Sequence, residues 1–294
     1  MGLIGGSVAL ALKKAGFVAH IVGIGSNKSM LEKALELGVI DSFTNAQDEN
    51  IQAACDGADV ILIAAPVAQT NSILRCMQPH LQPQTVITDV GSTKCDVLAC
   101  ANEVLGTQFS QFVGGHPIAG AEKSGVTAAT ADLFKGKNVV LTTHSICTAP
   151  DASVYVDSNE LNINQVKKMW YACGANVCEM TAENHDEIFA AVSHLPHLLA
   201  FALVDDIAKR ANAKELFSFA ASGFRDFTRI AGSSPVMWRD ISLANKTALL
   251  SEISAFEKEL SKLKQLLENN DGTGLQAIFE RASVARNNWA HDQK

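Results

Sequence analysis

Polar side chains with potential chemical roles gather in three segments of the chain. Residues 89–94 (DVGSTK) and 114–120 (GGHPIAG) each follow an apolar run with the composition of a buried strand, and residues 193–197 (SHLPH) lie in a helical pattern. A histidine or a serine at the end of a strand can act as a base or orient a hydroxyl, because ligands bind outside the carboxyl ends of parallel strands. These segments are the first candidates for a catalytic site.

His116 is the best-defined candidate. Gly114 and Gly115 precede it and allow the backbone to approach a ligand closely. Pro117 follows it and restricts His116 to extended backbone, which gives the ring a fixed direction. We therefore predict a functional role for this histidine. Ser92 lies in a segment that fits a ligand-binding turn and a polar turn capping the next helix equally well.

Two histidines occupy a helical pattern further along the chain. His194 and His197 share one helix face, and Pro196 between them should kink or start the helix. No His-Glu-x-x-His pattern or nearby carboxylate completes a metal set, so we predict no metal site. In the alternative interpretation, the histidines bond carbonyls that are freed in a proline-kinked core helix.

Residues 223–240 place Arg225, Arg229 and Arg239 among aromatic side chains. The planar fork of an arginine can hold a carboxylate through two hydrogen bonds. The alternative is a set of internal ion pairs, which we prefer for Arg239 because Asp240 is its neighbour.

The first residues of the chain match part of a dinucleotide-binding turn. The run Gly2-Leu3-Ile4-Gly5-Gly6 precedes a helical pattern over residues 7–15, and Gly2 and Gly5 fit the second and third glycines of G-x-G-x-x-G. In that turn the backbone approaches a pyrophosphate at a helix N-terminus. A strand pattern over residues 19–25 follows at the distance that a βαβ unit requires. We predict that this run binds a cofactor.

The strand over residues 19–25 ends without the carboxylate that bonds the adenosine ribose in many NAD-binding folds. Ser26, Asn27 and Lys28 follow, and their donors leave room for a 2′-phosphate. We therefore predict NADP or NAD as the cofactor; in the alternative, Lys28 is a solvated loop residue. The strand and first glycine that should precede the run are not in the printed chain, and we expect codons just upstream of Met1 to encode them.

Composition narrows the class of protein. The 294 residues predict two domains, and 47% hydrophobic with 19% charged residues is typical of a globular protein. A net charge of −7 without a basic cluster predicts no nucleic-acid partner. Apolar runs such as residues 60–67 and 195–204 are shorter than a membrane span, so we expect no membrane partner. Seven scattered cysteines predict reduced thiols and a cytoplasmic protein.

The pattern of strands and helices divides the chain in two. Residues 1–180 alternate helical segments with strand-like runs at residues 19–25, 59–66, 85–91, 111–116, 138–143 and 176–180. This alternation predicts an α/β domain with a doubly wound parallel sheet, Rossmann-like, whose first strand is missing from the chain as printed. Residues 181–294 carry only helical patterns, at residues 183–210, 213–221, 245–268 and 274–289. Residues 198–204 are apolar all round, so this helical domain should bury them internally or against a partner subunit.

Taken together, these segments resemble the prephenate dehydrogenase family, which includes arogenate and broad-specificity cyclohexadienyl dehydrogenases. The matching segments, in the order of the family, are residues 2–7, 89–94, 116–125, 193–197 and 226–240. The resemblance implies oxidation of a small molecule, prephenate, by NAD or NADP, with loss of CO2, to give 4-hydroxyphenylpyruvate on the route to tyrosine. It also implies that the helical domain forms a homodimer.

The resemblance assigns roles to individual side chains. His116 matches the base that bonds the substrate hydroxyl as hydride leaves the same carbon, and Ser92 matches a serine that orients that hydroxyl. Arg229 matches the arginine that holds the ring carboxylate. The residues that fall where the family lines the substrate pocket are Ser193, His194, His197 and Trp238.

Two alternatives stay open at this point. One is another two-domain dehydrogenase acting on a hydroxy acid, which would place a catalytic lysine in the helical domain; the combination of His116 and Arg229 argues against it. The other is a truncated, non-catalytic dimer that retains the helical domain and binds the cofactor poorly.

Overall fold

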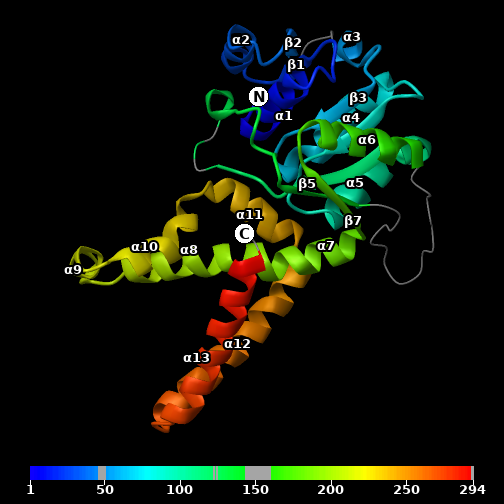
Figure 1. Cartoon of the computed structure of the whole chain (residues 1–294). Helices are drawn as coiled ribbons and strands as arrows, with labels where there is room; N and C mark the ends of the chain where they lie inside the picture. The colour runs from blue at the N-terminus through cyan, green and yellow to red at the C-terminus, as the bar shows by residue number, and fades with distance from the viewer. Residues whose placement is uncertain (46–50, 122, 124, 143–159, 293–294) are drawn as a thin grey trace. The chain divides into compact units, whose positions relative to one another are not determined.

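The computed structural model describes residues 1–45, 51–121, 123, 125–142 and 160–292 (Figure 1). They form two compact units, Met1–Lys246 and Thr247–Lys294. The loop expected over residues 144–162 lies outside the described residues, apart from its last three residues, which begin a helix.

The strands of the first unit form two sheets. In chain order they are β1 (Val22–Gly25), β2 (Ser42–Asn45), β3 (Val60–Ile63), β4 (Val86–Asp89), β5 (Phe112–Pro117), β6 (Asn138–Thr142) and β7 (Asn176–Met180). One sheet pairs β1 with β2, and the other has the order β3-β4-β5-β6-β7. Every described pairing is parallel except that of β5 with β6. Among the described residues no ladder joins β1 to β3, where a doubly wound sheet carries its first strand.

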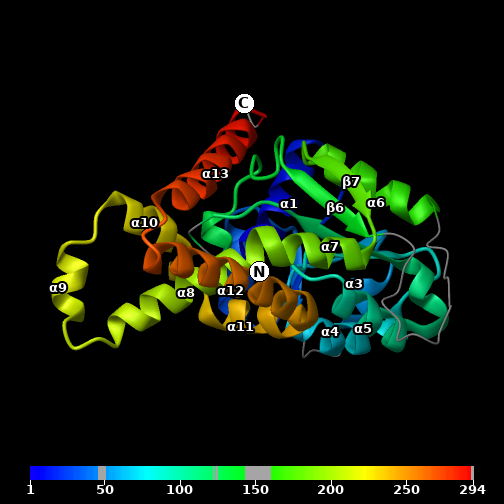
Figure 2. The ribbon, with the colours of Figure 1, turned by 90° about the horizontal axis from the view of Figure 1, so that it is seen from below.

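Helices cover both faces of the larger sheet (Figure 2). The α-helices of this part are α1 (Leu3–Lys14), α2 (Lys28–Glu36), α3 (Ile51–Cys55), α4 (Thr70–Met77), α5 (Cys95–Leu105) and α6 (Glu160–Ala172). Side chains of α1 and α6, such as Leu12 and Trp170, pack on one face, and those of α4 and α5, such as Leu74 and Leu98, pack on the other. Because both faces are covered, the strands are apolar and β4 is buried at every position.

The rest of the first unit is helical. Its elements are α7 (Ala182–Phe189), the π-helical η5 (Ala190–His194), α8 (Leu195–Ala208), α9 (Ala213–Ser218), α10 (Ser222–Thr228), the 3-10 helix η6 (Arg229–Gly232) and α11 (Pro235–Ala244). Thr181 caps α7 by accepting from the Asn184 N–H at 3.2 Å. The π segment ends just before Pro196, which has no N–H to donate to the preceding turn.

The elements α7, η5 and α8 form one continuous helix of 27 residues, Ala182–Ala208, which contains an 18-residue window with a mean hydropathy of 1.6. By length and composition alone this helix could cross a membrane, so the expectation that every apolar stretch is too short was wrong here. Its polar residues His185, Asp186 and His194 are buried within the first unit. All three bond residues of other segments, which anchors this part of the helix within the first unit.

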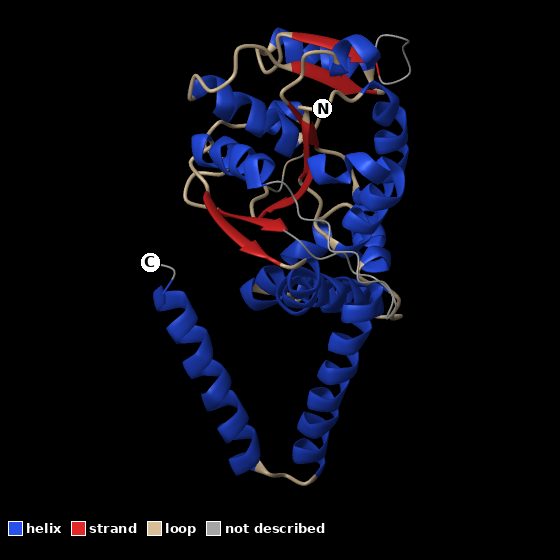
Figure 3. Cartoon of the chain, turned by 90° about the vertical axis from the view of Figure 1, so that its right-hand side faces the viewer, coloured by secondary structure: helices blue, strands red, loops and turns tan. Residues whose placement is uncertain are grey.

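The second unit is a helical hairpin. It is built from α12 (Lys246–Glu268), whose first residue belongs to the first unit, and α13 (Gly272–Asp292), and the two helices spread apart from their turn (Figure 3). Asn270 in that turn has a φ of 54°, the left-handed conformation that often ends a helix. Asp271 Oδ1 accepts from the Gly274 N–H at 2.8 Å and caps the first turn of α13.

The fold class predicted from the sequence is confirmed, with four differences in detail. The first helix begins at Leu3 rather than residue 7, so the glycine run forms its N-cap and first turn. β2 and α3 were not predicted, because β2 is a short run of mixed polar and apolar residues and α3 is a single short helical turn. β6 runs antiparallel to β5, since the described residues between them hold only the short η4 (Val126–Ala128) instead of a crossover helix. Cys95 is disulfide-bonded, so the expectation of reduced thiols was wrong for this residue.

The close approach of β4 and β5 predicts a strict requirement for glycine at position 115. A Cβ added there would lie 2.6 Å from the backbone oxygen of Asp89. Gly115→Ala should therefore lower the free energy of unfolding by about 1–3 kcal/mol in urea denaturation. Gly120→Ala is the matched control, because a Cβ at Gly120 meets nothing within 4 Å. Equal stability of the two variants would contradict this packing.

Candidate active site

A buried ion pair anchors the carboxyl end of β4. Lys94, whose side chain is fully buried, donates from Nζ to Asp89 Oδ2 at 2.5 Å and to the Gly115 carbonyl at 2.9 Å. Asp89 also accepts from the backbone N–H groups of Gly91 and Gly115, at 2.8 and 2.9 Å. Both charges have close partners, as a buried pair requires. The network fixes the end of β4 against β5, next to His116.

Asp186 of α7 caps the N-terminus of α5. Its Oδ1 accepts from the Lys94 N–H and its Oδ2 from the Cys95 N–H, each at 2.9 Å. An anion is favoured at this end of a helix, because the first N–H groups have no acceptor within the helix and the macrodipole is positive there. Asp186 therefore ties the start of the helical part to the dinucleotide-binding sheet.

The ring of His116 contacts that of His185, which in turn contacts the Asp186 carboxylate. His116 Nδ1 lies 2.8 Å from Nε2 of His185, and Nδ1 of His185 lies 2.7 Å from Oδ1 of Asp186. The His185 side chain is fully buried. Phe189, one turn along α7, packs its ring against both imidazoles, at centroid distances of 4.8 and 4.5 Å. The ring of His116 is thus fixed from one side.

His194 is linked to the same place through Asn245. Asn245 Nδ2 donates to the Asp186 carbonyl at 2.7 Å and lies 3.1 Å from His194 Nδ1. His194 is buried, and its Nε2 has no hydrogen-bond partner among the described residues. The Ser92 backbone lies beside this ring and contributes to its electrostatics. The structure therefore brings Ser92 and His194, two of the residues selected in the sequence, close together.

His197 and Trp238 form a second group. Their rings stack at a centroid distance of 3.6 Å and an angle of 20°, and the His197 Nδ1–H donates to the Ser193 carbonyl at 2.9 Å. Trp238 also meets the His194 ring, at 6.1 Å. The guanidinium of Arg229, on the 3-10 helix η6, is close enough to act electrostatically on His197. The predicted residues of the helical part thus form one connected group.

Burial lowers the pKa of all four histidines of this region. The pKa of His116 lies well below 6.5, mainly through desolvation, with further lowering from the charges of His185, Lys94 and His194. Desolvation lowers the pKa of His185 against the opposing hydrogen bond to Asp186, and lowers that of His194 to about 4.

The pKa of His197 is lowered by burial and by Arg229, against the opposing effect of the Ser193 carbonyl. All four imidazoles are therefore neutral at pH 7 and can accept a proton or a hydrogen bond.

The N-terminus of α1 fits a pyrophosphate. Gly2 is its N-cap without a side-chain cap, and the first turn carries no acidic residue. The N–H groups of Leu3, Ile4 and Gly5 therefore have no acceptor within the helix. A Cβ at Gly5 would lie 2.9 Å from the Ala64 Cβ after β3, and one at Gly6 equally close to Ala129, so these glycines allow close packing, whereas Gly2 faces open space. This is the division of roles that a dinucleotide-binding turn needs.

Ser26 and Asn27 lie between β1 and α2, Lys28 is the first residue of α2, and all three are exposed. Asn27 caps α2 by accepting from the Met30 N–H at 3.1 Å, so its amide oxygen is engaged. Lys28 Nζ lies 3.9 Å from Glu32, a loose pair that leaves the ammonium open to an anion.

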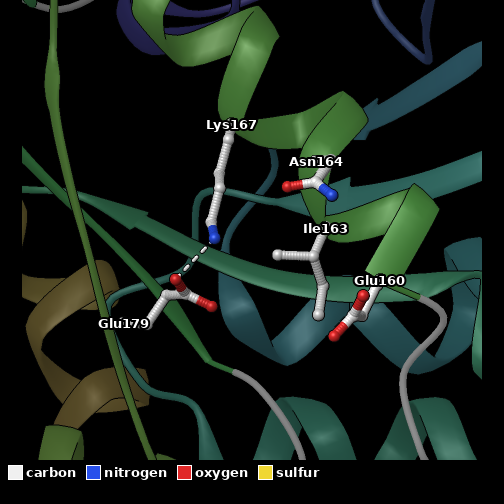
Figure 4. A pocket seen from close by; sticks show the side chains of 5 residues that line it. All are labelled: Glu160, Ile163, Asn164, Lys167 and Glu179. Atoms are coloured by element: carbon white, nitrogen blue, oxygen red, sulfur yellow. Dashed lines mark ion pairs between the residues drawn. The ribbon is translucent and has the colours of Figure 1, made fainter.

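A pocket of about 310 Å³ lies elsewhere, where α6 faces β7 (Figure 4). It is lined by Glu160, Ile163, Asn164, Lys167 and Glu179, and Lys167 pairs with Glu179 at 2.6 Å. None of the predicted site residues lines it, so it is separate from the candidate active site.

Four residues of the site were missed as site residues in the sequence. Lys94 belonged to a selected segment, but its burial could not be foreseen, since lysine is normally exposed. His185, Asp186 and Asn245 carry no local motif, and their partners lie at least 51 residues away in the chain apart from the His185–Asp186 contact. The one available signal was a buried-type position for His185 and Asp186 in α7, but the neighbouring Glu183, Asn184 and Glu187 make that helix polar and hide it.

A dinucleotide-type sheet with a neutral histidine at its carboxyl edge, followed by helices, places this chain among the two-domain nicotinamide-dependent dehydrogenases. Its family follows from comparison with known sequences. Residues 8–179 match the model described as prephenate dehydrogenase, nucleotide-binding domain, and residues 181–281 match prephenate dehydrogenase, dimerization domain. The chain belongs to the prephenate dehydrogenase family.

Individual relatives agree with this placement. Prephenate dehydrogenase of Bacillus subtilis is 38% identical over 296 residues, which cover 100% of this chain and 76% of that protein. Cyclohexadienyl dehydrogenase of Zymomonas mobilis is 31% identical, over 97% of this chain and 92% of the relative. The crystal structure of A. aeolicus prephenate dehydrogenase in complex with hydroxyphenyl propionate and NAD+ superposes with a TM-score of 0.85 at 36% identity, covering 97% of this chain and 94% of that one.

The lowered pKa values of the buried histidines predict a loss of stability in mild acid. A histidine whose pKa in the folded state lies below its unfolded value of about 6.5 does not lower the free energy of unfolding above pH 6.5, where it is neutral in both states. The free energy of unfolding then falls as the pH drops from 6.5 toward the pKa in the folded state, which for His194 is about 4. Each such histidine adds up to about 1.4 kcal/mol per pH unit to the slope of the free energy of unfolding against pH. The free energy of unfolding, measured in urea, should fall from pH 6.5 to 4.5, and less steeply in His194→Gln; identical slopes would contradict the assignment.

Proposed function

We propose that this protein oxidises prephenate with NAD or NADP and releases CO2 and 4-hydroxyphenylpyruvate, a step of tyrosine biosynthesis. The observation that carries the proposal is a neutral histidine, His116, fixed at the carboxyl edge of a dinucleotide-binding sheet in a chain whose two halves both match this family. Arogenate, which has an amino group where prephenate has a keto group, is the second substrate to test.

His116 acts as the base. Its Nε2 accepts a hydrogen bond from the substrate hydroxyl and stabilises the positive charge that builds up on the carbon losing hydride. The bound nicotinamide ring supplies the acceptor for that hydride. As the bond to the ring carboxylate breaks, its electron pair enters the ring and CO2 leaves, so the ring becomes aromatic and the product phenol retains a proton. Ser92 orients the same hydroxyl.

Arg229 holds the ring carboxylate in place for this loss. A guanidinium can bond both carboxylate oxygens, and its charge adds strength to each bond. Ser193, His194, His197 and Trp238 line the same pocket; the stacked pair of His197 and Trp238 supplies a flat, largely apolar wall for the ring.

The cofactor lies along the N-terminal part of the chain. Gly2, Leu3, Ile4, Gly5 and Gly6 would hold the pyrophosphate: the N–H groups of Leu3, Ile4 and Gly5 would bind it, while Gly6, whose N–H donates to the Gly2 carbonyl, allows close packing of the turn. Ser26, Asn27 and Lys28 would meet the adenosine ribose or its 2′-phosphate. Residues 1–180 form the dinucleotide-binding domain, and residues 181–294 form the helical substrate and dimerisation domain.

The protein works as a cytoplasmic homodimer without nucleic-acid or membrane partners. An interface between subunits would bury large apolar side chains that are exposed in the helices after β7, among them Phe219 at 82% and Leu243 at 66% exposure. The net charge of −7 and the burial of His185, Asp186 and His194 within the chain support the absence of such partners.

Two substitutions separate the role of the base from that of the carboxylate clamp. His116→Asn should lower kcat by about 10²–10⁴-fold with little change in KM, because it removes a general base. Arg229→Ala should mainly raise KM, by roughly 10–100-fold, since it removes a charged hydrogen bond present before and during reaction. Arg225→Ala, on the neighbouring turn, is the control and should leave KM unchanged. Steady-state assays with prephenate and arogenate measure both parameters, and near-normal turnover of His116→Asn would exclude this base.

Substitution of Gly25, at the end of β1, tests the preference of the enzyme between NADP and NAD. A Cβ there would make only ordinary contacts of 3.6 Å and more with Leu31, so an aspartate fits the position. The unmodified enzyme should use NADP at least as well as NAD. Gly25→Asp should shift preference to NAD through ribose hydrogen bonds and repulsion of the 2′-phosphate, whereas Gly25→Ala should not. Use of NAD alone by the unmodified enzyme would overturn this prediction.

A further inference from the structure

We propose that His185 and Asp186 are positioning residues that fix the tautomer of His116, so that its Nε2 faces the substrate as a bare lone pair. The inference rests on the proposed role of His116 as base. It assigns a function in the reaction to two residues that do not touch the substrate.

Among the described residues, the Asp186 carboxylate accepts hydrogen bonds from two backbone N–H groups. Its two oxygens accept the N–H groups of Lys94 and Cys95 at 2.9 Å, at the positive end of α5. An ionised carboxylate has lone pairs and no proton to give. The ring atom of His185 that lies 2.7 Å from Oδ1 must therefore carry the hydrogen, so His185 is protonated at Nδ1.

The second step follows from the burial of His185. Its side chain is fully buried, and desolvation lowers its pKa, so the ring is neutral and holds a single N–H. That hydrogen is at Nδ1, which leaves Nε2 as an acceptor. Nε2 lies 2.8 Å from Nδ1 of His116, so His116 must donate there. With its own single hydrogen at Nδ1, a neutral His116 has a bare Nε2.

Among the described residues, no other group that faces His116 determines which of its ring nitrogens carries the hydrogen. The charged and titratable groups that face it are His185 and Asp186 from α7, Lys94 at the start of α5, Asp89 from β4 and His194 from η5. Lys94 and Asp89 are occupied with each other and with the Gly115 backbone. When His116 takes up positive charge, the Asp186 carboxylate stabilises it through His185.

A matched pair of substitutions at position 185 tests the proposal. The amide of asparagine occupies the place of a histidine Nδ1, so His185→Asn keeps a donor to Asp186 and loses the acceptor for His116. The amide of glutamine reaches the place of Nε2, so His185→Gln restores an acceptor for the His116 Nδ1–H. Both variants lose the same buried ring, and their melting temperatures serve as the measure of structural damage.

We expect His185→Asn to lower kcat by about 10–100-fold with KM for prephenate within about two-fold of the unmodified enzyme. We expect His185→Gln to recover kcat to within about five-fold at a similar melting temperature. Phe189→Leu is the packing control: it touches both rings without a hydrogen bond, and should lower the melting temperature without a comparable loss of kcat.

The outcomes separate this inference from the proposed function. If His116→Asn loses turnover and His185→Asn keeps it, the positioning role is wrong while the base stands. If His116→Asn itself keeps turnover, the proposed base is wrong. If only His185→Gln folds, a loss of kcat as large as that of His116→Asn overturns the inference.

Discussion

The buried carboxylate of Asp186 is the constraint on which the rest of the site depends. An isolated charge in a protein interior is very unfavourable, so it must be surrounded by donors or neutralised. Here the donors are two backbone amides at the start of α5 and the ring of His185. Asp186 is therefore satisfied only when α5, α7 and the imidazole of His185 hold fixed relative positions. That requirement joins α7 to α5 and, through His185, orients the ring of His116.

The Lys94–Asp89 pair follows the same principle at Gly115, the residue before His116. Its two charges bond the backbone of Gly115 from both directions, at the N–H and at the carbonyl. Such close approach excludes side chains: a Cβ at Gly114 would lie 2.3 Å from Thr142 Oγ1, and one at Gly115 would meet the β4 backbone. The two glycines before His116 thus serve strand packing and the ion pair. From the sequence we predicted that these glycines allow the backbone to approach a ligand. In the structure they allow the backbone to approach the neighbouring strands.

Much of the fold could be predicted from the sequence, because apolar runs covered on both faces are unmistakable in β3, β4, β5 and β6. Short or polar elements could not: β2 has four residues of mixed character, and nothing in β6 itself indicates its antiparallel direction, which depends on the connection that precedes it. For the site, His116, Ser92, His194, His197 and Trp238 were selected by local motifs and resemblance. His185, Asp186 and Asn245 were not, because their roles exist only once segments 51 to 92 residues apart are packed together.

The central claim is that His116 presents an unprotonated Nε2, and the protonation of its two ring nitrogens can be observed directly. Protein labelled with ¹⁵N-histidine, studied by long-range ¹H–¹⁵N correlation at pH 7.5, reports each ring nitrogen, and the signals missing from His116→Asn identify His116. The account predicts a neutral ring with hydrogen on Nδ1 and none on Nε2, which is the order imposed by Asp186 and His185. A hydrogen on Nε2, or a ring protonated at both nitrogens at this pH, would contradict it.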